Sequence, residues 1–150
     1  MAVRLDEIDR AIVMLLQDNA RMSFAEIARR LKIGESKVRF RVRRLEKMGV
    51  ITKFMALVDP RKVGLPITGI LMLKIDPAHL DAVLEKLVLH KYTHHVFKST
   101  GECDCVVIVH ARDTTHLNEL VKRIKMLPGV RDVLVSIATA LIKIKTRLEP

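Results

Sequence analysis

The chain has 150 residues, enough for one domain or two small ones, and 49% of them are apolar, which suffices for a buried core. Only 3% are aromatic, and the net charge is +10. A chain this basic is attracted to polyanions, of which nucleic acid is the commonest, although ribosomal and membrane-surface proteins share the property.

Several other classes are excluded by the same composition. No apolar run approaches the roughly 18 residues that a membrane span needs, and the N-terminal stretch MAVRLDEIDR lacks the apolar core of a signal peptide. Two cysteines, Cys103 and Cys105, make no disulfide framework. We therefore expect a cytoplasmic protein.

Three helices are predicted at the start of the chain. Apolar residues at helical spacing predict a helix over about 5–19. Ser23, with Glu26 three residues later, has the pattern of a capping box and predicts the start of a second helix. After a break in which Gly34 tolerates the backbone of a tight turn, a third helix is predicted over about 35–48, ending at Gly49.

The third predicted helix has two different sides. At about 100° per residue, Val38, Val42 and Leu45 fall within one narrow arc, with Arg41 near its edge, where a structural role is open to it. The opposite side is basic and also carries one aromatic residue. Its members are Ser36, Phe40, Arg43, Arg44 and Lys47, with Lys37 and Arg39 at the flanks.

Two helices joined by a short turn, the second of them basic, are typical of a helix-turn-helix, whose second helix enters the DNA major groove. There, Arg and Lys pair with phosphates or guanine edges, and Phe40 is a candidate for contact with a thymine methyl group. The alternative is that the basic side is simply solvated, which is the commoner case for a basic helix. The spacing, the scarcity of acids and the outward Phe40 together favour DNA binding.

Apolar and polar residues alternate enough over residues 50–59 to predict a strand, as in the wing that often follows such a helix. Lys53 in this strand could contact a DNA phosphate. We therefore expect a DNA-binding domain over 1–60, a linker over 61–66 and a second domain over 67–150.

The second domain begins with Ile67–Ile75, which is apolar on both faces and predicts a buried strand. Asp76 and Pro77 are typical of a helix start. Strands are predicted at 96–100 and 103–111, joined by Gly101 and Glu102 in a type II′ hairpin. The inward residues of the two helices are expected to be Leu80, Val83, Leu84, Leu87 and Val88 in the first, and Leu117, Leu120, Val121 and Ile124 in the second, which begins near Thr114.

A last strand region over 130–144 completes the order β-α-β-β-α-β, the ferredoxin-like split motif. The predicted fold class is therefore α+β, with an N-terminal winged helix-turn-helix and a C-terminal ferredoxin-like βαββαβ domain. Two helices cover only one face of such a sheet, yet its strands are apolar on both faces. A second copy of the chain is the simplest cover, so we expect a homodimer.

Four segments, taken in order, resemble one family over nearly the whole chain. They are LDEIDRAIVMLLQDNARMSFAEIARRL, SKVRFRVRRLEKMGVITKF, STGECDCVVIV and LPGVRDV. Together they resemble the leucine-responsive regulatory protein and asparagine-regulator (Lrp/AsnC) family, also called feast/famine regulators. The resemblance implies a transcription regulator that forms dimers and often octamers, and that binds an amino acid or similar metabolite between dimers.

By position, Gly101 and Asp104 match family residues that help to form the effector pocket. A carboxylate can pair with the ammonium group of an amino acid, and a glycine lets a ligand approach the backbone. The competing interpretation is structural: Gly101 makes a turn and Asp104 caps the hairpin.

The sequence departs from the family pattern at three places near this pocket. Cys103 replaces an aromatic residue, Lys91-Tyr92-Thr93 replaces a Pro-x-Val pattern, and Val133-Leu134-Val135 replaces a Thr-x-Thr pattern. These changes remove polar groups from the pocket that the resemblance implies. Either the effector differs from the common ones, or the protein senses none.

Other functions remain open on the sequence alone. Cys103 and Cys105 lie two apart on a predicted strand, and with nearby histidines they would allow a metal site or a redox switch between subunits, but a buried core role is expected for them. An enzyme of the same two-part architecture, as in haem-precursor decarboxylation, would use His94, His95, Tyr92 and Arg112. A third alternative is an architectural DNA-binding protein without an effector. We expect a regulator without metal or cofactor and not an enzyme.

Overall fold

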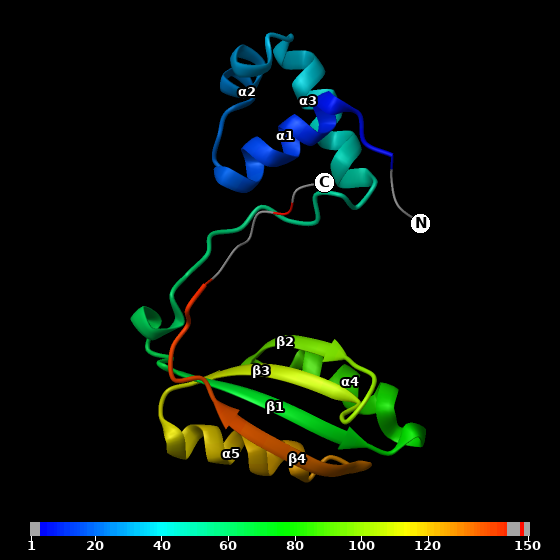
Figure 1. Cartoon of the computed structure of the whole chain (residues 1–150), viewed down its shortest axis with the longest axis vertical. Helices are drawn as coiled ribbons and strands as arrows, with labels where there is room; N and C mark the ends of the chain where they lie inside the picture. The colour runs from blue at the N-terminus through cyan, green and yellow to red at the C-terminus, as the bar shows by residue number, and fades with distance from the viewer. Residues whose placement is uncertain (1–3, 144–147, 149–150) are drawn as a thin grey trace. The chain divides into compact units, whose positions relative to one another are not determined.

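The structure is a computed structural model that describes residues 4–143 and 148. The chain divides into two compact units, one made of residues 1–57 and 142–150 and the other of residues 58–141 (Figure 1). No helix within the described residues is long and apolar enough to cross a membrane.

The first unit contains the three predicted helices, α1 (Glu7–Asp18), α2 (Phe24–Leu31) and α3 (Glu35–Lys47). Each turns its apolar side toward the other two, and these sides form one core. The buried members of that core are Ile12, Leu16, Met22, Ile27, Ala28, Val38, Val42 and Leu45.

The caps of these helices differ in part from the prediction. Ser23 accepts a hydrogen bond from the N–H of Glu26 at 3.2 Å, as predicted. The reciprocal half of that box is wrong, because the Glu26 carboxylate pairs with Arg30 at 2.6 Å. A complete capping box forms instead at the start of α1, where Asp6 and Asp9 each accept a hydrogen bond from the backbone N–H of the other.

The turn between α2 and α3 does not use its glycine as predicted. Gly34 has φ of −70°, which any residue adopts, and it serves as the N-cap of α3. The left-handed residue of the turn is Lys32, with φ of 54°. Gly49, with φ of 69°, follows the end of α3 as predicted.

The strand predicted over 50–59 is wrong: residues 52–59 form no regular element. A strand needs a neighbouring strand to satisfy its backbone hydrogen bonds, and all four strands of the described chain lie within residues 67–137. The segment instead exposes apolar side chains, with Phe54, Met55 and Leu57 at 42%, 65% and 64% of full exposure. Lys53 is exposed as well.

The second unit has the predicted β-α-β-β-α-β order and forms one antiparallel sheet with strand order β2-β3-β1-β4. Two short 3₁₀ turns, η1 (Pro60–Val63) and η2 (Pro77–His79), precede β1 and the first helix, so that helix begins at Leu80 and not at Pro77. The elements are β1 (Ile67–Ile75), α4 (Leu80–Leu89), β2 (Thr93–Lys98), β3 (Cys105–Ala111), α5 (Thr114–Lys125) and β4 (Val130–Ile137).

The hairpin between β2 and β3 is longer than the predicted two-residue turn, because residues 99–104 form its loop. Asp104 is tied to β1: its N–H donates to the carbonyl of Leu73 at 2.9 Å, and its carboxylate accepts from the N–H of Ile75 at 2.8 Å. Strand β3 begins at Cys105, so Cys103, which was predicted to lie in the strand, lies in the loop. Strand β4 ends at Ile137, and residue 144, the end of the predicted strand region, lies outside the described residues.

Both helices of the second unit pack on one face of the sheet and share one core with it. The four inward residues predicted for α5 are buried, as are Val83 and Leu87 of α4, whereas Leu80 and Leu84 are only partly buried. The prediction for Val88 is wrong, because this residue is 66% exposed. At about 100° per residue, it points well away from the line that Val83 and Leu87 direct at the sheet.

The opposite face of the sheet is apolar and has no helix on it. The strand register places Ile70 and Met72 of β1 beside Ile108 and Val106 of β3 on this face, and all four are only half-buried. Phe97 of β2 extends the same face and is 52% exposed. The structure therefore leaves an apolar sheet surface of the kind that the sequence predicted.

Candidate nucleic-acid interface and effector site

Helix α3 is held in place by its apolar side. Val38, Val42 and Leu45 are at most 1% exposed and pack into the core formed with α1 and α2. Because the three side chains lie on one narrow arc, they fix which side of α3 faces outward. The sequence predicted this anchoring arc, and the structure confirms that its residues are buried.

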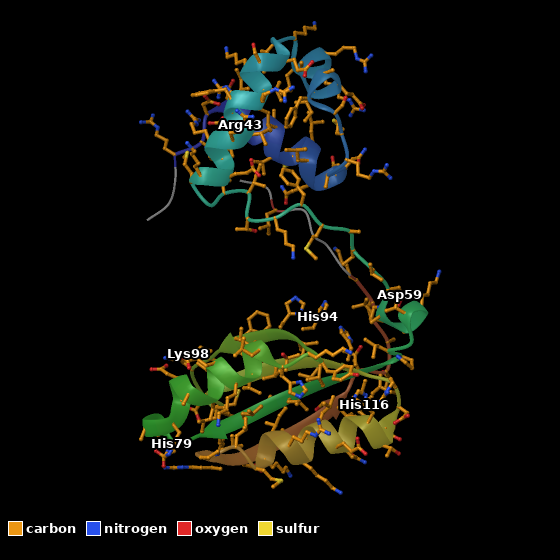
Figure 2. The ribbon with its side chains drawn as sticks, turned by 180° about the vertical axis from the view of Figure 1, so that it is seen from behind. Arg43, Asp59, His79, His94, Lys98 and His116 are labelled. Atoms are coloured by element: carbon orange, nitrogen blue, oxygen red, sulfur yellow. The ribbon has the colours of Figure 1, made fainter. Side chains whose placement is uncertain are left out.

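The outward side of α3 carries most of the predicted DNA-binding residues. Phe40 is 67% exposed, an unusual position for a large aromatic side chain. Among the described residues, no ion-pair partner is recorded for Lys37, Arg43 or Lys47 (Figure 2 labels Arg43). The residues exposed on this side or at its flanks are Ser36, Lys37, Arg39, Phe40, Arg43 and Lys47.

Arg39 is less free than its neighbours. Its guanidinium pairs with Glu35 one turn earlier at 2.8 Å and lies over the ring of Phe24 in α2, 5.3 Å from the ring centroid. The side chain is still 49% exposed. These contacts hold Arg39 across the α2–α3 turn, so it can contact a ligand only from a restrained position.

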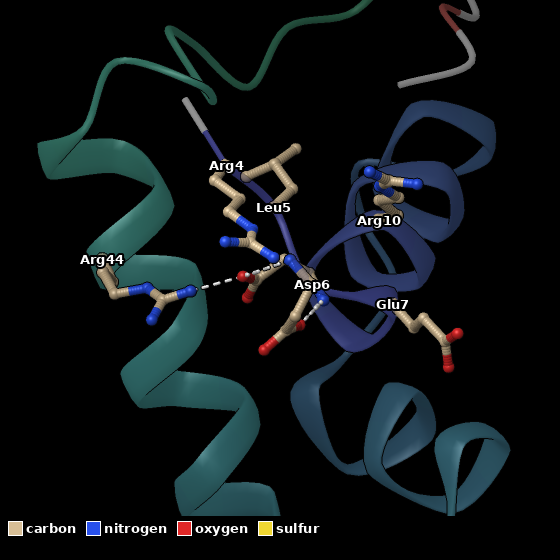
Figure 3. A pocket seen from close by; sticks show the side chains of 7 residues that line it. Arg4, Leu5, Asp6, Glu7, Arg10 and Arg44 are labelled. Atoms are coloured by element: carbon tan, nitrogen blue, oxygen red, sulfur yellow. Dashed lines mark hydrogen bonds and ion pairs between the residues drawn. The ribbon is translucent and has the colours of Figure 1, made fainter. Parts of the chain in front are cut away.

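Arg44 is placed differently from the rest of the predicted set. Its guanidinium donates to the carboxylate of Asp9, which is fully buried, so Arg44 connects α3 with α1 (Figure 3). Arg41 makes a second link to the same carboxylate at 2.8 Å and also binds Asp6 at 2.6 Å. Arg41 thus has the structural role that the sequence left open to it, and Arg44 shares this role of joining α3 to α1.

Electrostatics follow from this cluster. Hydrogen bonding from Arg41, and then from the backbone N–H of Asp9, lowers the pKa of Asp6 to about 2. The same pairing with Asp6 raises the pKa of Arg41. Sequence reasoning did not single out Asp9 and therefore missed the cluster. The available signal was that Asp9 stands four residues after Leu5, next to Ile8, on the inward side of α1.

Beside the cluster is a mainly polar surface cavity of about 480 Å³ (Figure 3). Its acidic residues at 6 and 9 are already paired with arginines. The other charged residues of its lining, Arg4, Glu7 and Arg10, carry charges of both signs and form no ion pair among the described residues. Its lining residues are Arg4, Leu5, Asp6, Glu7, Asp9, Arg10 and Arg44.

The two predicted effector residues lie in the loop between β2 and β3. Gly101 has φ of +107°, in the region that favours glycine, and a Cβ there would meet no atom within 4 Å. Asp104 is half-buried, and one of its carboxylate oxygens accepts the hydrogen bond from Ile75. The turn role of Gly101 is therefore present, whereas the Asp104 carboxylate bonds to β1 and not within the β2–β3 hairpin. The second carboxylate oxygen of Asp104 has no hydrogen-bond partner among the described residues.

The cysteines and histidines are dispersed over different surroundings. Cys105 is fully buried, and burial raises the pKa of its thiol to about 11, so it is protonated at neutral pH. Cys103 is half-buried, with its Sγ 3.4 Å from the Oγ of Ser99. Within the described part of the chain, no group of three or more His, Cys, Asp or Glu side chains is arranged to hold a metal ion.

The candidate enzyme residues also fall into separate clusters. Tyr92 packs against the helix-side core, and its ring meets that of His116 edge-on at 4.4 Å. His94 instead lies against His95 and His110, at ring distances of 5.1 and 4.8 Å. Tyr92 and the paired histidines thus belong to different surroundings.

Comparisons with known proteins agree with these two units. Residues 5–52 match a family model described as winged helix-turn-helix DNA-binding, and residues 68–148 match one described as the Lrp/AsnC ligand binding domain. The chain belongs to the Lrp/AsnC family. It is therefore an HTH-type DNA-binding transcriptional regulator with a ligand-binding domain, in a family of regulators and not of enzymes.

Similar regulators occur in archaea. An HTH-type transcriptional regulator of Pyrococcus abyssi is 39% identical over 142 residues, which is 94% of this chain and 90% of that one. The regulator Ptr1 of Methanocaldococcus jannaschii is 40% identical over 115 residues, covering 77% of this chain and 78% of its own. These similarities extend over both units of this Lrp/AsnC chain.

Solved structures share the fold. The structure of Escherichia coli AsnC has a TM-score of 0.89 at 21% identity and covers 99% of this chain and 100% of its own. A transcriptional regulator of Neisseria meningitidis, solved in complex with L-Met, has a TM-score of 0.89 at 25% identity, covering 97% and 96%.

Proposed function

We propose that this Lrp/AsnC protein is a homodimeric, sequence-specific regulator that reads a palindromic DNA site and responds to an amino acid or related metabolite. DNA reading is assigned to residues 1–60, followed by a linker over 61–66, and oligomerisation and effector binding to residues 67–150. The observation that carries the proposal is the outward side of α3, where unpaired cations surround an exposed Phe40 on a helix with a firmly buried opposite side.

The contacts that we assign to DNA follow from residue chemistry. Lys37, Arg43 and Lys47 are suited to phosphates or guanine edges, and Phe40 to a thymine methyl group. Ser36 and Arg39 can donate further hydrogen bonds to the DNA. Arg44 is retained with a lesser role, because its side chain is 40% exposed while its guanidinium is paired with Asp9. Two α3 helices in a dimer would read half-sites about one helical turn apart, or a multiple of it.

Self-association is supported by apolar surface in both units. The open face of the sheet presents Ile70, Met72, Val106 and Ile108, and a second copy of the same face would cover it. In the first unit, Phe54, Met55 and Leu57 are exposed apolar side chains of their own. Assembly of dimers into larger particles, up to an octamer, belongs to the same proposal.

An amino-acid effector is supported by the ligand-binding domain and by the L-Met bound to the Neisseria relative. We assign Gly101 and Asp104 to its pocket. The loop of residues 99–104 offers the second carboxylate oxygen of Asp104 and the exposed side chain of Glu102, and Cys103 stands where the family has an aromatic residue. The departures from the family pattern favour an amino acid or related metabolite that differs from the family's common effectors, acting in the cytoplasm where the DNA is.

The test is DNA selection from a random pool by the purified protein, with and without a mixture of amino acids. Enrichment of a palindrome that changes when amino acids are added is the expected result. Tight binding without any enrichment would refute sequence-specific reading and favour an architectural DNA-binding protein. The net charge of +10 is enough for such binding without sequence preference. Enrichment that amino acids leave unchanged would refute the effector part alone.

A further inference from the structure

Helix α4 has a second apolar stripe on the side away from the sheet. Val83 and Leu87, at 2% and 1% exposure, use its inner side. On the outer side, Val88 and Leu89 are 66% and 85% exposed. With Leu84 they line a shallow groove whose remaining residues, Asp81 and Glu85, are acidic. We call these five residues the α4 stripe.

The charges of the α4 stripe are poorly compensated within the chain. Asp81 and Glu85 are one turn apart, a spacing at which like charges destabilise a helix. Asp81 meets Lys98 of β2 at 3.7 Å, but both side chains are largely exposed (Figure 2 labels Lys98). Among the described residues, Glu85 has no recorded ion pair. An acidic stripe with exposed aliphatic side chains fits a partner that is basic and apolar.

The end of α5 has the complementary character. Met126, just after the helix, is 81% exposed, and Lys122 lies four residues before it on the outward side. Lys125 and Arg123 flank them, and α5 turns its other side into the core. No ion pair is recorded for these three cations within the part of the chain that the structure describes.

We propose that the α4 stripe of one copy binds the end of α5, at Lys122, Lys125 and Met126, of another copy. In this contact Asp81 and Glu85 pair with the lysines, and Val88 and Leu89 cover the methionine. Contacts between two different surfaces continue from copy to copy and close into a ring when the rotation allows it. The inference rests on the proposed self-association and deepens it, because the open sheet face stays free for the dimer.

The experiment is a pair of charge reversals, with particle mass measured by light scattering during size-exclusion chromatography. The parent chain is expected to form particles larger than a dimer. D81K/E85K alone and K122E/K125E alone are each expected to stop at the dimer. An equal mixture of the two variants restores contacts between opposite charges, and larger particles are expected to return.

Two controls separate this contact from the rest of the proposed function. E7K/E46K changes the net charge by the same amount as D81K/E85K, but on exposed residues of the first unit. It should assemble like the parent. V88S/L89S removes only exposed apolar surface and should lower the mass to that of a dimer while keeping the core of α4.

A parent that is already only a dimer would overturn this inference and leave the proposed homodimer intact, whereas a monomeric parent would overturn both. Reversed variants that assemble like the parent would also overturn it. So would a mixture that stays dimeric, because α5 would then not be the partner.

Discussion

The buried carboxylate of Asp9 offers the sharpest test of how the DNA-binding unit is held together. Asp9→Asn keeps the size of the side chain but removes its negative charge. In the parent, the carboxylate is fully buried and accepts hydrogen bonds from Arg41 at 2.8 Å and from Arg44. The substitution therefore leaves two guanidiniums without their shared partner.

The size of the effect follows from the exposure of the two arginines. Removing one partner of a fully buried ion pair costs about 3–5 kcal/mol. Here Arg41 is 14% exposed and Arg44 is 40% exposed, so both can regain some water. We therefore expect a smaller loss, about 2–3 kcal/mol in the free energy of unfolding of the first unit.

The assay is native-state hydrogen exchange of the backbone amides of α1 and α3 in the full chain, because the two units need not unfold together. Asp6→Asn is the matched control: it removes an exposed carboxylate that binds the same Arg41, and asparagine is still a good N-cap. Faster exchange in the Asp9 variant than in the Asp6 variant is expected. Equal exchange in the two variants would refute the argument from burial.

Four further outcomes are expected. Arg43→Ala should weaken binding to the selected site by about 1–3 kcal/mol, while Arg123→Ala, which removes the same charge from the second unit, should not; equal losses would mean that only net charge matters. Phe40→Ala should narrow the affinity gap between selected and random DNA, and an equal loss on both would exclude the thymine-methyl contact. Lys32→Gly should raise the thermal midpoint of the first unit, because the left-handed backbone of Lys32 (φ 54°) costs about 1 kcal/mol for a residue with a Cβ and nothing comparable for glycine. A lower midpoint would contradict this. The pKa of Asp6 is lowered from 3.8 to about 2, so its stabilising effect is complete above pH 3.8 and is lost as pH falls toward 2; the parent should therefore lose stability over this range more steeply than Asp6→Asn, and parallel curves would count against the Arg41 pair.

Much of the fold was predictable because it depends on local periodicity. The buried arc of α3 needs only residues at 38, 42 and 45 on a helix, and the inward residues of α5 follow the same rule. Phe40 lies on the side of α3 opposite its buried arc, so its outward position follows from the same periodicity. The family resemblance added what periodicity cannot give, namely that the second unit corresponds to a ligand-binding domain.

The errors arose where a distant part of the chain decides a local outcome. A strand over 50–59 requires a neighbouring strand, which the first unit does not contain among its described residues. The hairpin loop spans residues 99–104, and its last residue, Asp104, bonds to β1, 29 residues earlier in the chain, a contact that no local pattern predicts. Arg44 has an outward position on the helix wheel, yet a buried carboxylate on another helix draws it inward.

The sequence by itself therefore determined the helices, the order of the strands and the basic outward side of α3, since each depends on neighbours within a few residues. Only the tertiary structure decided which of those cations are without an ion pair among the described residues and which of them hold α1 against α3. It also decided that the outer side of α4 remains exposed. The physical reason is that ion pairing and burial are set by groups that meet in space, and their separation along the chain carries no local signal.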